Sequence, residues 1–103
     1  LKHVTVVKPT GRIDSATAPE LEKSLQQLLD AHRNQIVIDL QATDYLGSAG
    51  LRVLVAQQKA ARKNGGALRL AQPTARVREV FDLAGLTSVF EIYPDTVEAV
   101  GSF

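Results

Sequence analysis

The chain has 103 residues, of which 45% are hydrophobic and 22% charged, and its net charge is +1 at pH 7. This composition is typical of one soluble domain over residues 1–103, and so small a net charge argues against binding to nucleic acid or to an anionic membrane. The absence of cysteine excludes disulfides, thiolate metal sites and cysteine nucleophiles, and no apolar run approaches the roughly 18 residues of a membrane span, so no membrane insertion is expected.

The first 40 residues predict a β-rich opening, a helix and a further strand. Residues 3–14 contain the β-like run VTVV and then GRID. Thr17 followed by Glu20 predicts a capping box, and Pro19 suits a first helical turn. The run QIVIDL at 35–40 is rich in β-branched residues and predicts a strand buried on both faces. Helical spacing predicts that five residues share the buried face of the helix: Leu21, Leu25, Leu28, Leu29 and His32.

The rest of the chain continues this alternation. A second helix is expected from about Ala49 to Lys63, and Asn64-Gly65-Gly66 ends it because glycine and asparagine readily adopt the left-handed conformation of a helix C-terminus. The run ALRLA at 67–71 predicts another strand. The remaining elements expected are a helix from Pro73–Thr74 to Gly85, a strand at 89–93 and a short helix capped by Asp95.

Strands that alternate with helices imply right-handed crossovers and a sheet of mainly parallel character. The expected fold class is therefore α/β. We predict a single small domain with a mixed, mostly parallel sheet of about four or five strands and about four helices packed against it.

The segment YLGSAGL at 45–51 places four small residues between apolar stretches. A nucleophile elbow needs glycine two residues before and two residues after its serine, and here Leu46 stands at the first of these positions. A catalytic triad also needs a histidine, and only His3 and His32 are present. A serine hydrolase is therefore not supported.

Other catalytic and ligand-binding sites find no better support in the sequence. Gly47 and Gly50 lack the Lys and Ser/Thr that follow them in a phosphate-binding loop. Two histidines without a suitably spaced partner do not make a metal site. Asp39 lies in an expected strand and Asp44 in the turn after it, so nothing holds the two carboxylates at one substrate. We expect a protein that is not an enzyme and that carries no metal or cofactor.

Ser48, at the start of the second expected helix, has two interpretations. Its hydroxyl could cap the helix by accepting a hydrogen bond from a free backbone N–H. The same position also tolerates a phosphate, because a helix N-terminus offers unpaired N–H groups and a partial positive charge. Small neighbours leave the hydroxyl accessible to a kinase, and Arg52, one turn later, could pair with the added charge.

Three landmarks follow one another in order: GRIDSATAPEL at 11–21, IVIDL at 36–40, and YLGSAGLRVLVAQQKAARKNGGALRLAQ at 45–72. Together they resemble the STAS domain family, and the likeness continues through VREVFDLAGL at 77–86. The resemblance implies a sheet with helices on one side and a cytoplasmic protein that binds rather than catalyses. The serine turn is the most specific part of this likeness.

In the stand-alone branch of the family, the unphosphorylated protein binds an anti-sigma factor that is also a serine kinase, and so releases a sigma factor. Phosphorylation of the serine at the head of the second helix ends this binding, and a serine phosphatase restores it. The resemblance implies that Ser48 is the phosphorylated residue. It also implies a partner-binding surface at the GRID and serine turns, with five residues: Asp14, Ser15, Ser48, Ala49 and Arg52.

The sequence departs from the family pattern on both sides of Ser48. The residue before the serine is usually aspartate and here is Gly47, and the residue after it is often Ser or Thr and here is Ala49. The loss of the aspartate removes a carboxylate that could orient the hydroxyl, and it also removes a negative charge that would repel a phosphate.

Two alternative functions remain open from the sequence. The first is a STAS module of a larger assembly, such as a transporter tail, a lipid-trafficking complex or a stress-sensing scaffold. Because the chain opens on Leu1 and contains no Met, we expect the native protein to begin before Leu1. The second is a nucleotide-binding protein with a pocket near Asp14 and Ser48.

Several candidate site residues also have a purely structural interpretation. Asp14 could end a strand and restrain a turn. Arg52, Lys59 and Lys63 form a stripe that could be the solvated face of the second helix. Gly50 could let that helix pack closely on the strand before it.

Overall fold

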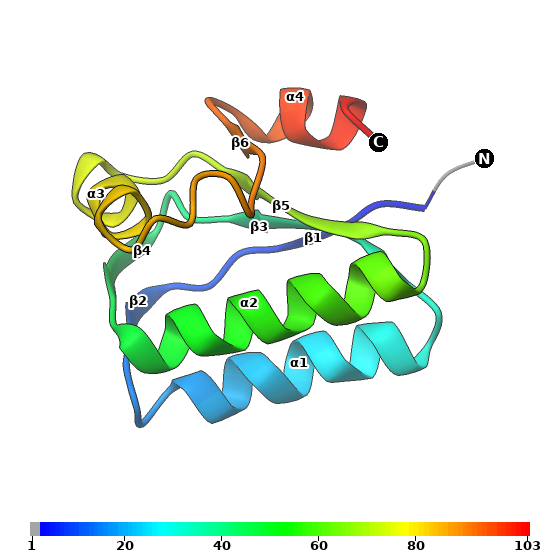
Figure 1. Ribbon diagram of the computed structural model, residues 1–103, viewed down its shortest axis with the longest axis horizontal. Helices are drawn as coiled ribbons and strands as arrows, with labels where there is room; N and C mark the ends of the chain where they lie inside the picture. Colours follow the sequence, from blue (N-terminus) through cyan, green and yellow to red (C-terminus); the bar gives the residue numbers. More distant parts are fainter. Residues whose placement is uncertain (1–2) are drawn as a thin grey trace.

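The computed structural model describes residues 3–103, which form six strands and four helices (Figure 1). The strands are β1 (Thr5–Val7), β2 (Gly11–Ile13), β3 (Gln35–Asp39), β4 (Thr43–Leu46), β5 (Ala67–Ala71) and β6 (Ile92–Tyr93). The helices are α1 (Ala18–Asp30), α2 (Ser48–Lys63), α3 (Ala75–Leu83) and α4 (Thr96–Gly101).

The strands form two sheets, and every strand pair among residues 3–103 is parallel. The main sheet has the order β1-β3-β5-β6, and β2 and β4 form a separate pair. Strand β1 pairs with β3. Further along the same two segments of chain, after a break in the pairing, β2 pairs with β4. At this break Gly11 has φ +77°, which glycine adopts without strain, and its N–H donates to Ala42 O at 2.8 Å. The expected α/β fold class is confirmed.

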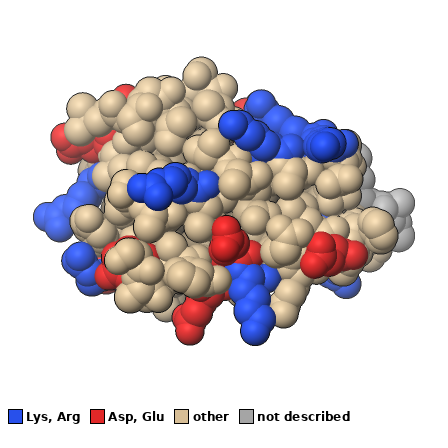
Figure 2. Space-filling view, turned by 60° about the horizontal axis from the view of Figure 1, so that its bottom comes forward, with Lys and Arg blue, Asp and Glu red and all other residues tan. Residues whose placement is uncertain are grey.

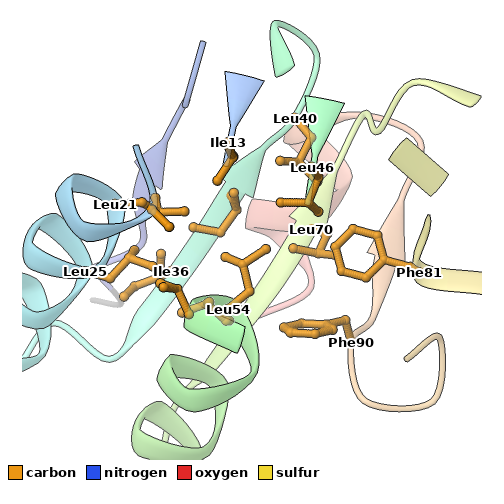
Figure 3. Close-up of a cluster of buried hydrophobic side chains, with 14 of the residues drawn as sticks. Ile13, Leu21, Leu25, Ile36, Leu40, Leu46, Leu54, Leu70, Phe81 and Phe90 are labelled. Carbon is orange, nitrogen blue, oxygen red and sulfur yellow. The ribbon is translucent and has the colours of Figure 1, made fainter. Parts of the chain in front are cut away.

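The main core lies between the large sheet and helices α1 and α2, which run side by side across one face of it (Figure 1). Alternate side chains of β3 and β5 point toward these helices, and the four concerned are fully buried: Ile36, Ile38, Leu68 and Leu70. Phe81 of α3 and Phe90 extend this core with their rings edge to face, 5.6 Å between centroids (Figure 3). Each such buried side chain stabilises the fold by about 1.5–3 kcal/mol.

Helix α4 lies on the opposite face of the main sheet. Val37 and Ala71 alternate with the core residues of their strands and pack instead with Ala99 of α4. The start of α4 is held by the buried Asp39 carboxylate, which accepts a hydrogen bond from Thr96 Oγ1 at 3.0 Å. The expectation of helices on only one side of the sheet is therefore wrong, because the last helix crosses to the other face.

Three expected strand boundaries are corrected by the structure. The β-rich opening at 3–14 is two strands in different sheets, and Thr43–Leu46 forms a strand where a turn was expected. The last strand covers only Ile92–Tyr93 and not 89–93. Val89 instead lies in the turn before this strand, where its carbonyl oxygen accepts a hydrogen bond from the buried Gln58 Nε2 at 2.9 Å.

The predicted buried face of α1 is confirmed except at its end. Leu21, Leu25 and Leu29 are buried and Leu28 is half-buried. His32 is exposed, because α1 ends at Asp30 and the histidine follows the helix with φ 61°.

Candidate functional site

The GRID turn and the serine turn lie next to each other because β2 and β4 are paired in parallel. Ile13 is the register partner of Leu46, and the N–H of Gly47 donates to Ile13 O at 2.9 Å. Paired strands lie about 4.8 Å apart, so the residues that follow their carboxyl ends emerge at one edge of this small sheet. Two turns separated by more than 30 residues in the chain are thus brought to one surface.

The turn after β2 is stabilised by its own polar side chains. Asp14 Oδ1 accepts hydrogen bonds from the N–H groups of Ala16 at 3.0 Å and Thr17 at 3.2 Å. These two hydrogen bonds hold the pKa of the Asp14 carboxyl below its ordinary value, and the bond from Thr17 has the larger effect. The nearby Arg12 guanidinium lowers this pKa further. Asp14 therefore restrains the turn, as its structural interpretation predicted, and its side chain also remains half-exposed.

The capping box expected at Thr17 is not formed. The Thr17 hydroxyl turns away from the helix, where it accepts from the N–H of Asp14 at 2.9 Å and donates to Arg12 O at 2.8 Å. The prediction that Thr17 caps α1 with its side chain is thus wrong, because the competing turn takes this hydroxyl.

Ser48 is exposed and is the first residue of α2. The residue at the N-cap position is Gly47, whose backbone is extended (φ −95°, ψ 179°). The interpretation of Ser48 as the N-cap is therefore wrong, because the N-cap lies one residue earlier. Its exposure leaves Ser48 accessible from solvent at the start of the helix.

Gly50 allows the serine turn to lie directly on the two short strands. A Cβ atom at this position would lie 2.6 Å from Ile13 Cγ2 and 2.6 Å from Leu46 Cδ1. Both side chains are almost fully buried. The expectation that Gly50 lets α2 pack closely on the preceding strand is confirmed.

A shallow groove of about 510 Å³ runs between the starts of α1 and α2. Three of the predicted partner-binding residues line it: Ser15 at the α1 end, and Ala49 and Arg52 on α2. Asp14 and Ser48 directly precede two of these residues in the chain. The groove is completed by Ala18, Pro19, Glu22, Val53 and Ala56. Its surface is therefore small and largely apolar, with one acidic and one basic side chain.

Charges on the helical face are segregated between α1 and α2. The exposed charged residues of α2 are all basic, whereas three of the four on α1 are acidic. Figure 2 shows a band of Lys and Arg side chains above a band that holds most of the Asp and Glu side chains on this face. The basic residues of α2 are Arg52, Lys59, Arg62 and Lys63, and the acidic residues of α1 are Glu20, Glu22 and Asp30.

Two residues beside the serine turn were not found from the sequence. Arg12 and Tyr45 are register partners on β2 and β4, and the Arg12 guanidinium carbon lies 4.2 Å from the centroid of the Tyr45 ring. Arg12 Nε also lies 3.7 Å from Asp14 Oδ2. The burial pattern of Thr43–Leu46 does not alternate, since Asp44 and Tyr45 are both exposed, so the sequence carries no periodic signal for this pair.

The other candidate residues do not assemble into a catalytic or metal site. Asp39 is buried under α4 while Asp44 is exposed on β4. His3 and His32 are both exposed and line a pocket with Arg33 and Asn64 at the other ends of the two long helices. Residues 3–103 contain no cluster of metal-binding side chains. None of their helices is long and apolar enough to cross a membrane.

Comparison with known proteins gives consistent matches over nearly the whole chain. The family model described as the STAS domain matches residues 1–99. BtrV of Bordetella bronchiseptica, named as an anti-sigma factor antagonist, is 37% identical over 93 residues, which cover 90% of this chain and 80% of that protein. The anti-sigma-B factor antagonist of Bacillus subtilis is 34% identical over 86 residues, 84% of this chain and 78% of the relative.

A solved structure agrees with these matches. The crystal structure of an anti-sigma factor antagonist from Mycobacterium paratuberculosis superimposes with a TM-score of 0.87 and is 33% identical in sequence. The match covers 96% of this chain and 84% of that one.

Proposed function

Since this chain belongs to the STAS domain family, we propose that it is an anti-sigma-factor antagonist. In its unphosphorylated form it binds an anti-sigma factor that is also a serine kinase, and thereby releases a sigma factor. Phosphorylation of Ser48 by the bound kinase ends the complex, and a serine phosphatase restores the binding form. The role is one of binding, in agreement with the names of the relatives, which are regulators.

The observation that carries this proposal is the position of Ser48. Its side chain is exposed at the first residue of α2, beside a second turn that the β2–β4 pairing brings to the same edge. A kinase active site needs a hydroxyl that it can enclose from several sides. Small residues on either side of Ser48, Gly47 and Ala49, leave room for this.

The proposed partner surface consists of the two turns and the groove between α1 and α2. Asp14 and Ser15 contribute one side, and Ser48, Ala49 and Arg52 the other. The groove is largely apolar, which favours close contact with a partner side chain, while Arg52 and Glu22 among its lining residues provide opposite charges for orientation.

Phosphorylation would disrupt this surface for an electrostatic reason. A phosphoserine carries about −1.5 to −2 charges at pH 7. In a close-fitting interface such a charge must either lose its hydration or keep the two proteins apart, and each costs binding free energy. The unmodified serine has no such cost.

The proposal is tested by incubating the protein with ATP and the anti-sigma factor kinase of the same organism. We expect a mass increase of one phosphate on the wild type and none on Ser48→Ala. Ser15→Ala, which removes the other exposed hydroxyl of the surface, and Ser24→Ala on α1 serve as matched controls and should still be modified. A phosphate found at another residue, or on no residue, would contradict the proposal.

Binding provides the second readout. Ser48→Asp should weaken binding to the same kinase by about 1–3 kcal/mol, because a buried charge or an unsatisfied polar group costs this much. Ser24→Asp adds the same charge away from the surface and should bind like the wild type. Equal weakening by both variants would mean that net charge, and not the serine turn, controls the complex.

A further inference from the structure

We propose that Arg12 and Tyr45 form a receptor for the phosphate group on Ser48. The inference rests on the proposed function, since it concerns the modified form of the same serine. It assigns to these two side chains the task of holding the phosphate against the β2–β4 pair.

The Arg12 guanidinium is held in place before any phosphate arrives. It lies over the Tyr45 ring, 4.2 Å from the centroid, and such a cation–π contact limits the number of orientations that the side chain samples. Its ion pair with Asp14 runs through Nε at 3.7 Å, which leaves the two terminal amino groups for another anion. The Arg12 side chain is 63% exposed, so an incoming phosphate can reach these groups.

Gly47 brings the Tyr45 hydroxyl close to the start of α2. A Cβ atom at residue 47 would lie 3.1 Å from Tyr45 Oη and 3.1 Å from Cε2. The edge of the phenol ring therefore rests against the residue that directly precedes Ser48. Gly47 adds no side chain to the space beside this hydroxyl, and Ser48 is the next residue along the chain.

The donors around this position suit a phosphate dianion. Arg12 can donate to two phosphate oxygens at once, as arginine commonly does. The Tyr45 hydroxyl can donate one further hydrogen bond. The first turn of α2 adds unpaired N–H groups and a partial positive charge, and Gly47 supplies no carboxylate that would repel the phosphate.

The consequence concerns regulation. A phosphate bound by Arg12 and Tyr45 turns toward the β2–β4 side of the serine turn and removes the positive charge of Arg12 from the surface. The surface of the modified protein therefore has a second defined arrangement, in which Arg12 and Tyr45 bind the phosphate.

The test uses the full chain with phosphoserine installed at residue 48 during synthesis, so that no kinase is needed. The ionisation of the phosphate is followed by phosphorus NMR between acidic and neutral pH. We expect its second pKa to lie about one pH unit below the ordinary value near 6, because an adjacent guanidinium favours the dianion. Arg12→Ala should return the pKa most of the way to the ordinary value. Tyr45→Phe, which keeps the ring under the guanidinium, should return it by a smaller amount.

Two further variants test whether the change in the phosphate pKa depends on the position of the arginine and on its paired donors. Arg33→Ala removes an exposed arginine beyond the far end of α1 and should leave the phosphate pKa unchanged. Arg12→Lys keeps the charge but not the paired donors, and should give an intermediate pKa. The proposal is overturned if the phosphate of Arg12→Ala titrates as in the wild type, since the helix start alone then sets its pKa. Such a result would leave the kinase assay on Ser48 unaffected, and a failed kinase assay would leave this titration equally valid.

Discussion

The starts of α1 and α2 differ in how their polar groups are used. The turn before α1 engages its side chains in internal hydrogen bonds, with the Asp14 carboxylate and the Thr17 hydroxyl bonded to the turn itself. The turn before α2 is instead held by a backbone hydrogen bond from Gly47 to Ile13 and by the close packing of Gly50. One turn is rigid through its polar side chains, and the other is rigid through its backbone.

This difference explains how an accessible serine can be combined with a fixed position. If the Ser48 hydroxyl were needed to stabilise its own turn, its modification would also weaken the fold. Because the backbone and Gly50 fix the serine turn, the hydroxyl is free for modification, while the neighbouring Asp14 turn supplies a rigid edge beside it.

The largest effect should come from changing the packing that fixes the serine turn. Gly50→Val should destabilise the protein by about 1–3 kcal/mol, because even the first carbon of the side chain would overlap Ile13 and Leu46. Urea denaturation gives the free energy of unfolding. Ala56→Val places the same β-branched residue at an exposed position of α2 and should cost clearly less. Equal losses in the two variants would show that helix propensity, and not packing, makes glycine necessary.

A smaller effect should distinguish the two hydroxyls directly. Thr17→Val keeps the shape of the side chain but removes the hydrogen bonds that the Thr17 hydroxyl makes in the first turn, and should lower the free energy of unfolding by about 1 kcal/mol. Ser48→Ala should change it by less than about 0.5 kcal/mol, as surface substitutions usually do. A destabilisation by Ser48→Ala equal to that of Thr17→Val would contradict the comparison of the two turns.

The smallest effect concerns the pH dependence of the first turn. The pKa of Asp14 is lowered in the folded state, chiefly by the hydrogen bond from the N–H of Thr17. Its charged form therefore adds stability above the pKa of about 3.9 of an unfolded aspartate, and this contribution is lost as the pH falls through the lower folded value. The free energy of unfolding should be measured from pH 7 to pH 3 for the wild type and for Asp14→Asn. At neutral pH the wild type should be slightly more stable. The difference should shrink below about pH 4. A constant difference over this range would exclude a contribution from ionisation.

The main elements of the fold were predictable from the sequence because they follow periodic burial. The leucines of α1 and the β-branched run of β3 each show one regular pattern, and both elements occur as expected. The strand β4 was not predictable in the same way. Its sequence TDYL is short and contains an aspartate, and it becomes a strand because β2 lies beside it.

The candidate site was predictable only in part. Ser48 and its exposure follow from a helix start rich in small residues. The register of β2 against β4, which places Arg12 over Tyr45, depends on contacts between segments more than 30 residues apart and leaves no local signal. The capping box at Thr17 failed for a local reason, since the backbone groups of Asp14 and Arg12, shortly before it in the chain, take its hydroxyl as a hydrogen-bond partner.

The contact between Gly47 and the Tyr45 ring has a consequence for how this sequence can evolve. A side chain added at residue 47 would press on the phenol ring at 3.1 Å, so the ring must first shift or be replaced. Residues 45 and 47 are therefore coupled, and the effect of a change at one depends on the residue at the other. An aspartate at 47 would require the phenol ring to shift, and a shift of the ring would change its contact with the Arg12 guanidinium.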